Sequence, residues 1–349
     1  MATIVMADDG IQFDGRTPET RALGGAESAV VSLAEALAAR GHRVLAFTNC
    51  EAALHHKGVD WAPLHAGGAY AGLPQAADLY IANRGHRLVG RVPGAKARAF
   101  WVHNPAGYLL KARYLWPLWR HRPTIVFIGT YHEGTLPGWV PDGGRKTIPY
   151  GTPEMFAASA PASTPPGARA IFTSNPLRGL DWLLDRWVGE IRPNVDGAEL
   201  HIFSGAATYG AAGDAKADEM SRVLDRARSL AGSGVVLRGP VAKEALIDEL
   251  RAARVMLYRG DINETYCQSV AEAQVLGVPA VVTDLGSMAE RVADGETGYV
   301  VTSDADFSAA ASRLLVDDAL WQACHDAARA RRLAWTWDMA AASFEGLMN

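Results

Sequence analysis

Short apolar runs alternate with amphipathic stretches through the first half of the chain. After the first run, apolar side chains recur at helical spacing from Val30 to Leu37, and the pattern ends at Gly41. The apolar runs predict strands at Ile4 to Ala7, Val44 to Phe47, Leu79 to Ala82, Phe100 to Val102 and Ile125 to Ile128. Apolar strands separated by helices are typical of a parallel sheet that is covered on both faces.

The pattern changes between Pro149 and Pro166. Residues 157–167 are small, proline-rich and polar, which is typical of a linker between domains. After this segment the alternation restarts, with strands expected at Ala170 to Phe172, Leu200 to Phe203, Val235 to Leu237, Val255 to Leu257 and Ala280 to Val282. The sequence therefore predicts two α/β domains, each with a doubly wound sheet.

Composition narrows the functional classes. The 349 residues are too many for one ordinary core and suit two domains. The hydrophobic content of 49% excludes a disordered protein, and the net charge of −4 argues against a general nucleic-acid binder. The N-terminus lacks the basic start and apolar run of a signal peptide, and no stretch is apolar enough to span a bilayer. We therefore expect a cytoplasmic protein.

Two glutamates eight positions apart, Glu264 and Glu272, give the clearest chemical signal. An expected strand ending at Tyr258 leads through a short loop to Glu264, and an apolar helix then carries Glu272 on its second turn. Free N–H groups at the start of such a helix bind phosphate, and nearby carboxylates accept hydrogen bonds from hydroxyls. Phosphate together with many hydroxyls describes a nucleotide sugar. The alternative is a pair of surface glutamates on an ordinary helix.

The segment from Asn263 to Ala273, followed by Leu276 to Val282, resembles the signature of retaining GT-B glycosyltransferases, closest to glycosyltransferase family 4. The resemblance implies that Glu264 contacts hydroxyls of the transferred sugar and that Glu272 holds the ribose of the nucleotide. It places further donor-binding residues at Gly205, Val241, Thr265, Tyr266 and Cys267. Cys267 stands where the family usually has Gly, at a point where the backbone approaches the donor.

The resemblance also implies a domain organisation. GT-B proteins have two facing Rossmann-like, doubly wound domains. Here residues 1–160 would form the acceptor-side domain and residues 161–333 the nucleotide-sugar-binding domain. Residues 334–349, which begin near the Trp335-Thr336-Trp337 segment, would form a terminal helix that crosses back onto the first domain.

Other positions match the family by their place in the chain. Gly24 and Gly25 open the first long helix, where the family has a Gly pair near the donor phosphates, although a plain tight turn is the alternative. Arg178 matches one of two cations that neutralise the donor diphosphate, and the loop before it is short, so the other cation lacks a clear counterpart. His103 ends a strand where the family often has a sugar-contacting His, and a buried structural histidine is equally compatible. The candidate catalytic residues are Glu264, His103 and Arg178.

Residues 108–122 form a basic, aromatic and leucine-rich stretch without an acidic residue. Such stretches lie on anionic membrane surfaces, and packing of the Trp and Leu residues against the core is the alternative. Pro117 is expected to break a helix there. The basic residues are Lys111, Arg113, Arg120 and Arg122.

The resemblance implies a retaining transfer of a hexose-type sugar from a nucleoside diphosphate sugar to a hydroxyl of a carbohydrate or lipid-linked acceptor. By family analogy the pathway would be cell-surface polysaccharide or glycolipid synthesis, with peripheral contact at the inner membrane face. We find no Asp-x-Asp metal signature in a setting suited to sugar transfer, no zinc spacing and no P-loop, so we expect no metal and no cofactor. A GT-B nucleotide-sugar epimerase or hydrolase and a non-catalytic nucleotide-sugar-binding partner remain alternatives.

Overall fold

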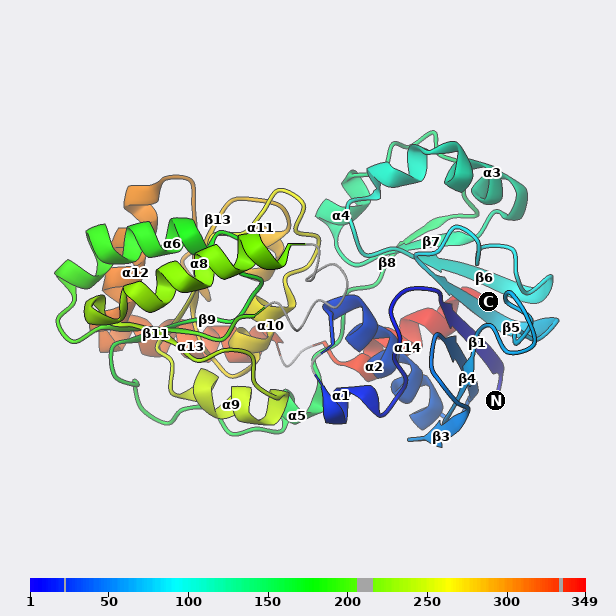
Figure 1. The fold of residues 1–349 in the computed structure, drawn as a ribbon, viewed down its shortest axis with the longest axis horizontal. Helices are drawn as coiled ribbons and strands as arrows, with labels where there is room; N and C mark the ends of the chain where they lie inside the picture. The colour runs from blue at the N-terminus through cyan, green and yellow to red at the C-terminus, as the bar shows by residue number, and fades with distance from the viewer. Residues whose placement is uncertain (22, 206–215, 333–334) are drawn as a thin grey trace. The chain divides into compact units, whose positions relative to one another are not determined.

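The computed structural model describes the whole chain except residues 22, 206–215 and 333–334 (Figure 1). The chain forms two compact units. Unit 1 comprises Met1–Gly151 and Trp335–Asn349, and unit 2 comprises Thr152–Ala334. The division lies earlier than the boundary expected at residue 160, because Phe156 is packed in the core of unit 2.

Unit 1 contains a sheet of eight strands in the order β3-β4-β2-β1-β5-β6-β7-β8. Neighbouring strands are parallel, except for the antiparallel pair of β3 and β4. The chain passes from β1 to β2 on one side and returns to β5 on the other, so the strand order reverses between β1 and β5. The strands are β1 (Thr3–Asp8), β2 (Arg43–Thr48), β3 (Leu54–His56), β4 (Val59–Pro63), β5 (Ala76–Asn83), β6 (Gly94–Trp101), β7 (Thr124–Phe127) and β8 (Arg145–Thr147).

The helix expected after the first strand is confirmed as α2 (Gly25–Ala39), which buries its apolar stripe. The terminal helix, α14 (Trp337–Glu345), belongs to the same unit and packs against α2. Its Phe344 ring lies edge-on to Trp101, with centroids 5.2 Å apart, and Arg40 forms ion pairs with Asp338 and Glu345. The remaining helices of unit 1 are α1 (Thr17–Thr20), η1 (Ala106–Leu110), α3 (Ala112–His121), α4 (Thr130–Gly134) and η6 (Gly346–Met348).

The expectation that Pro117 breaks a helix is wrong. Helix α3 runs through this position, with Pro117 inside it. Proline removes one backbone donor and crowds the preceding turn, which costs roughly 3 kcal/mol in a helix interior. Burial of Leu118, which is fully shielded from solvent, offsets part of this cost.

Unit 2 contains a fully parallel six-stranded sheet in the order β11-β10-β9-β12-β13-β14. The strand order reverses between β9 and β12, as it does between β1 and β5 in unit 1. All five strands expected here are confirmed, and β14 was not predicted. The strands are β9 (Arg169–Phe172), β10 (Glu199–Ile202), β11 (Val235–Leu237), β12 (Val255–Tyr258), β13 (Ala280–Thr283) and β14 (Gly298–Val301).

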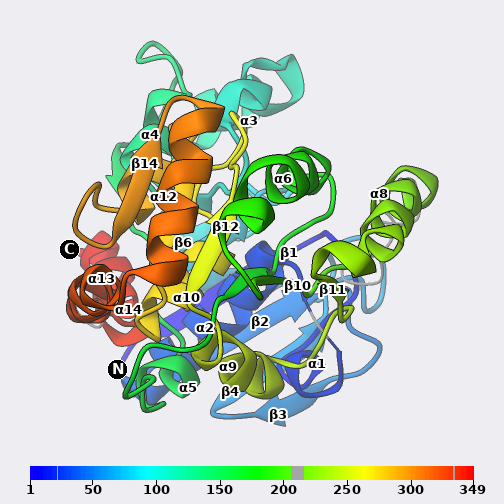
Figure 2. The ribbon, with the colours of Figure 1, turned by 90° about the vertical axis from the view of Figure 1, so that its left-hand side faces the viewer.

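Helices cover both faces of the unit 2 sheet (Figure 2). One layer holds α6 (Leu180–Arg186), which continues through η2 (Trp187–Ile191) and η3 (Arg192–Asn194), together with α8 (Ala217–Ser229) and α12 (Asp304–Val316). The other holds α5 (Glu154–Ala157), α9 (Lys243–Arg251), α10 (Gln268–Val275) and α13 (Asp318–Arg332). Two short helices, η5 (Ala231–Ser233) and α11 (Met288–Arg291), complete the unit.

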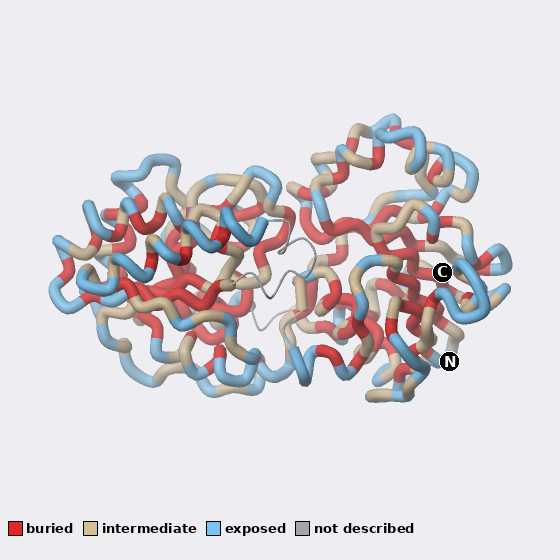
Figure 3. The backbone as a smooth tube through the Cα atoms, in the orientation of Figure 1, coloured by how far each residue is buried: buried red, intermediate tan, exposed pale blue. Residues whose placement is uncertain are grey.

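Burial follows this layering. The strands at the centre of each unit are buried, whereas the connecting segments are more exposed (Figure 3). No helix in the part of the chain that the structure describes is long and apolar enough to cross a lipid bilayer.

Candidate active site

The first cluster of candidate residues lies where the strand order of unit 2 reverses. Arg178 follows β9 and Glu264 follows β12, the two strands on either side of the reversal. Ligands of open parallel sheets bind at the carboxyl ends of the strands at such a point. The fold therefore brings together two residues that are 86 positions apart in the sequence.

The carboxylate of Glu264 is held by three hydrogen bonds. Its Oε2 accepts from the hydroxyl of Tyr258 at 2.7 Å and from Nη1 of Arg178 at 3.2 Å. Its Oε1 accepts from the backbone N–H of Cys267 at 3.2 Å, at the start of α10. Burial raises the pKa of Tyr258 well above its usual range, so its hydroxyl remains a donor to Glu264. The carboxylate is thus fixed in orientation beside a cation and a helix N-terminus.

Cys267 has a backbone conformation that favours glycine. It is the N-cap of α10 and has φ 59° and ψ 81°, which is the left-handed region. The side chain is buried, and burial raises the pKa of its thiol to about 12, so the thiol is protonated at neutral pH. The departure from the family's Gly therefore imposes local strain rather than adding a reactive group.

We predict that Cys267→Gly is more stable than Cys267→Ala by about 1 kcal/mol, since both variants lose the thiol and only alanine keeps the Cβ in a left-handed conformation. Urea denaturation of both variants measures the difference. Equal stabilities would contradict the strain. Part of this difference is an N-cap effect, because glycine is a better N-cap residue than alanine.

The second cluster is centred on Glu272. Glu272 is only 3% exposed, and Nζ of Lys243 donates to both of its carboxylate oxygens at 2.6 Å. Lys243 is the first residue of α9 and follows the turn that contains Pro240 and Val241. Gly205 lies against this turn, because a Cβ at Gly205 would be 2.8 Å from Cγ of Pro240.

Lys243 was not found from the sequence. A single lysine 29 positions before its partner carries no pattern of its own.

Thr265 and Tyr266, the other expected donor contacts, are both buried beside Glu264, and the guanidinium of Arg291 lies 4.2 Å from the centre of the Tyr266 ring. The described part of the chain contains no group of three or more His, Cys, Asp or Glu side chains that could hold a metal ion.

The Gly24–Gly25 pair lies in unit 1, where it has a local structural role. Gly24 is the N-cap of α2, and a Cβ there would be 2.6 Å from Oε2 of Glu27. This space allows Glu27 to fold back and pair with Nη2 of Arg84 at 2.6 Å. Arg84 also pairs with the fully buried Asp8, at 3.1 Å. One guanidinium is thus shared by two carboxylates inside unit 1.

His103 is buried in unit 1, and both of its ring nitrogens are engaged. Nδ1 meets the hydroxyl of Tyr150, and Nε2 meets Oδ1 of Asn83, whose amide nitrogen in turn donates to Asp8. Burial holds the pKa of His103 well below its usual range, and the nearby Arg84 acts in the same direction. In the neutral ring, Nε2–H donates to Asn83 and Nδ1 accepts from Tyr150. The geometry therefore places His103 in a polar network, and a role towards a sugar stays a prediction.

Acidification should destabilise unit 1 through His132. Burial lowers its pKa to about 4, partly offset by its bond to the carbonyl of Asn104. Between about pH 6.5 and pH 4 the unfolded chain binds a proton that the folded state excludes, so stability falls with decreasing pH by at most about 3 kcal/mol. Urea denaturation across this range should give a smaller slope for His132→Gln. The exposed His55→Gln is the control, and a slope in His132→Gln equal to that of the unmodified protein would contradict the prediction.

Comparison with known proteins identifies the family that most of unit 2 matches. A family model described as group 1 glycosyl transferases matches residues 169–317, which begin with β9 and end just after α12. Residues 169–317 are a group 1 glycosyltransferase domain. Arg178, Glu264 and Glu272, together with Lys243, all lie within this glycosyltransferase domain.

Curated relatives match over part of their length. The chain is 35% identical to D-inositol 3-phosphate glycosyltransferase of Streptomyces avermitilis over 111 aligned residues. These residues are 31% of this chain and 24% of that protein. The protein of the same name from Streptomyces bingchenggensis is 31% identical over 108 residues, which cover 30% and 24%. The chain thus spans about a quarter of the length of the curated relatives that it matches.

Solved structures resemble the whole chain. Sucrose-phosphate synthase from Thermosynechococcus elongatus superposes with a TM-score of 0.75 at 18% identity, covering 99% of this chain and 98% of that one. Anabaena HepE in complex with UDP and glucose gives a TM-score of 0.73 at 13% identity, with 99% of each chain covered. The chain therefore has the GT-B fold, with two Rossmann-like units.

Proposed function

We propose that this protein is a retaining, metal-independent glycosyltransferase. It moves a hexose-type sugar from a nucleoside diphosphate sugar to a hydroxyl acceptor. The observation that carries the proposal is the Arg178–Glu264 pair at the reversal point of the glycosyltransferase domain, beside the N-terminus of α10. Curated relatives named as inositol phosphate glycosyltransferases and a neighbour bound to UDP and glucose support it.

Charge develops on the departing diphosphate and on an oxocarbenium-like sugar in such a transfer. Arg178 and the first N–H groups of α10, which have no backbone acceptor within the helix, stabilise the diphosphate. These groups supply positive charge without a metal ion. Glu272, held by Lys243, binds the ribose.

Glu264 orients the sugar and does not attack it. Its carboxylate already accepts three hydrogen bonds, so its orientation is fixed and its nucleophilicity is reduced. The acceptor hydroxyl instead attacks from the face of the leaving group, and its proton passes to a phosphate oxygen of the donor. The sugar then keeps its anomeric configuration.

The donor is tested by thermal stabilisation with UDP, GDP, TDP and ADP sugars in the presence of a chelator. A ligand present at about 100 times its Kd stabilises the folded state by roughly 2.7 kcal/mol. We expect a shift with one nucleotide family that is lost in Glu272→Gln and kept in Glu244→Gln, an exposed neighbour on α9. A shift that survives Glu272→Gln would contradict the ribose role.

The reaction itself is tested by product analysis. Incubation with donor and an acceptor panel, followed by NMR of the anomeric proton, should give a product with retained configuration. Release of free sugar or an epimerised donor without acceptor would favour the hydrolase or epimerase. Binding without turnover across the panel would favour a non-catalytic partner.

We also propose that α3 contacts an anionic membrane surface. Trp116 and Trp119 are 66% and 54% exposed and stack with ring centroids 5.2 Å apart. Basic side chains flank them, and this combination favours anionic headgroups. The alternative, packing of the stretch against the core, holds for Leu118, which is buried. It does not hold for Trp116 and Trp119, whose indoles remain exposed.

Sedimentation with vesicles that contain anionic lipid tests this contact. Trp116→Ala with Trp119→Ala should weaken binding, and Trp139→Ala, an exposed indole outside α3, is the control. Undiminished binding in the double variant, or after neutralisation of Lys111, Arg113, Arg120 and Arg122, would contradict the contact.

A further inference from the structure

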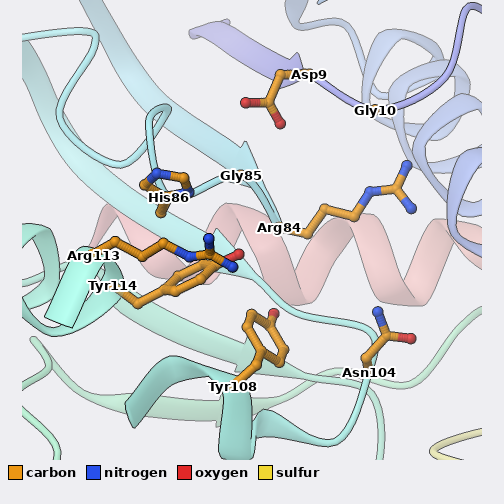
Figure 4. A pocket seen from close by; sticks show the side chains of 9 residues that line it. All are labelled: Asp9, Gly10, Arg84, Gly85, His86, Asn104, Tyr108, Arg113 and Tyr114. Atoms are coloured by element: carbon orange, nitrogen blue, oxygen red, sulfur yellow. The ribbon is translucent and has the colours of Figure 1, made fainter. Parts of the chain in front are cut away.

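Unit 1 contains a pocket of about 520 Å³ at the carboxyl edge of its sheet (Figure 4). Asp9 and Gly10 line it directly after β1, and Arg84, Gly85 and His86 line it directly after β5. The pocket therefore lies where the strand order of unit 1 reverses, which is where parallel sheets bind ligands. All nine residues that line it belong to unit 1, whereas Arg178 and Glu264 belong to unit 2. The other residues that line it are Asn104, Tyr108, Arg113 and Tyr114.

The pocket contains one buried hydroxyl, that of Tyr108. The phenol oxygen of Tyr108 is shielded from solvent and forms no hydrogen bond with any described residue. Figure 4 shows it pointing towards the space enclosed by the labelled side chains. Burial raises the pKa of Tyr108, so the hydroxyl remains protonated and can donate as well as accept. An unsatisfied buried hydroxyl costs free energy, and a polar ligand group would recover it.

The pocket combines an aromatic wall with polar groups. The ring of Tyr114 lies 5.0 Å, centroid to centroid, from both Tyr108 and His86. Asp9 accepts one long hydrogen bond, from Tyr70 at 3.3 Å, and its carboxylate has further acceptor capacity. An apolar wall with a few convergent polar groups is typical of a small-molecule site, and this combination matches a sugar ring with hydroxyls at its edge.

Besides the Asp9 carboxylate, the pocket has one cation that lacks a carboxylate partner among the described residues, and this cation can bind an anionic group. Arg84 is neutralised by its two carboxylate partners, Asp8 and Glu27. Arg113 has no carboxylate partner among the described residues, and its guanidinium only faces the Tyr114 ring at 5.6 Å. His86 is neutral at pH 7, because burial lowers its pKa and Arg113 acts in the same direction. Arg113 is thus the cation of the pocket that is left for a ligand.

We propose that this pocket binds the acceptor, and that the acceptor is a small sugar that carries a phosphate or carboxylate group. Its anionic group pairs with Arg113, its ring lies against Tyr108 and Tyr114, and its hydroxyls bond to Asp9 and to the Tyr108 hydroxyl. The role of this ligand as acceptor rests on the proposed glycosyl transfer. The binding of an anionic sugar in the pocket does not depend on that proposal.

Calorimetry on the full chain tests the binding with hexose 6-phosphates, hexuronates, their neutral parent hexoses and inorganic phosphate. We expect a phosphorylated or carboxylated sugar to bind, and its neutral parent to bind at least about tenfold more weakly, the loss expected for one charge-assisted hydrogen bond. The more favoured of the two anionic classes identifies the group at Arg113. Failure of every anionic sugar at millimolar concentration, equal affinity for the neutral parents, or phosphate binding as tightly as the sugar phosphates would each overturn the proposal.

Matched variants locate the site. Arg113→Gln should weaken binding by about tenfold, whereas Arg120→Gln, an exposed cation on the same helix outside the pocket, should not. Tyr108→Phe should weaken binding severalfold without lowering thermal stability, because its hydroxyl has no partner in the part of the chain that the structure describes. Equal losses in Arg113→Gln and Arg120→Gln, or none in Arg113→Gln, would overturn the assignment.

The nucleotide-sugar shift of unit 2 separates this inference from the proposed function. It should be unchanged in Arg113→Gln and Tyr108→Phe. If the protein binds the donor and transfers sugar, but Arg113→Gln does not change the affinity for the acceptor, only the assignment of the pocket is contradicted. Anionic-sugar binding that depends on Arg113, without transfer, would remove only the proposed reaction.

Discussion

Glu264→Gln should lower turnover by about a hundredfold or more while the protein keeps its fold. The amide preserves the shape of the side chain and still accepts from Tyr258, so the local structure is retained. It removes the negative charge that holds Arg178 and that accepts hydrogen bonds from sugar hydroxyls. Because both effects act on the reacting sugar and its leaving group, the loss should appear in kcat more than in the Kd of the nucleotide.

Steady-state kinetics with the donor identified by thermal stabilisation measures this loss. Asp261→Asn is the matched control, since Asp261 lies 3.7 Å from the same guanidinium and is more exposed. We expect a change of severalfold at most in that variant. Comparable losses in the two variants would mean that general electrostatics around Arg178, rather than Glu264 itself, controls the rate.

Arg84→Met should lower the free energy of unfolding by about 3–5 kcal/mol at neutral pH, the cost of leaving buried charges without their partner. Asp8 is completely buried and Glu27 nearly so, and the variant leaves both carboxylates without a cation. Burial already raises the pKa of Asp8 in the presence of Arg84, which acts against the rise. Without the guanidinium, the folded state favours the protonated carboxyl even more.

The sign of the pH dependence follows from this rise. A carboxyl whose pKa is higher in the folded state than in the unfolded chain contributes stability at low pH that is lost as the pH rises. The difference between Arg84→Met and the unmodified protein should therefore shrink from pH 7 to pH 5 in urea denaturation. Arg87→Met, an exposed arginine close by in sequence, should differ little at either pH. A difference that is independent of pH would contradict the role of the buried carboxylates.

The sequence predicted the interior of the fold better than its margins. β12 and the central part of β5, residues 79–82, are continuous apolar runs, because a strand buried on both faces needs apolar side chains there. The edge strand β8 has the sequence Arg-Lys-Thr, and β3 contains two histidines, so neither has a hydrophobic signal. Their pairing depends on the neighbouring strand, which local pattern does not encode.

The candidate site was predictable only where a local motif existed. Glu264 and α10, the helix that carries Glu272, lie in one short segment. Lys243 pairs with Glu272 through the tertiary fold, and Arg84 lies 57 positions from Glu27 and 76 from Asp8. Such partners are isolated charged residues in the sequence. The same reasoning applies to Arg113, which in the sequence was one of four basic residues in residues 108–122 and in the structure lines a pocket.

Because α14 belongs to unit 1, the two units differ in when all of their residues have been translated. Unit 2 is one uninterrupted stretch of chain, so every residue it needs has been made before Trp335 is added. Unit 1 is split, and Arg40 and Trp101 gain their partners Asp338, Phe344 and Glu345 only after all of unit 2 has been translated. Since domains generally fold as units, unit 2 can fold during synthesis at a stage when unit 1, although it begins earlier in the chain, still lacks α14.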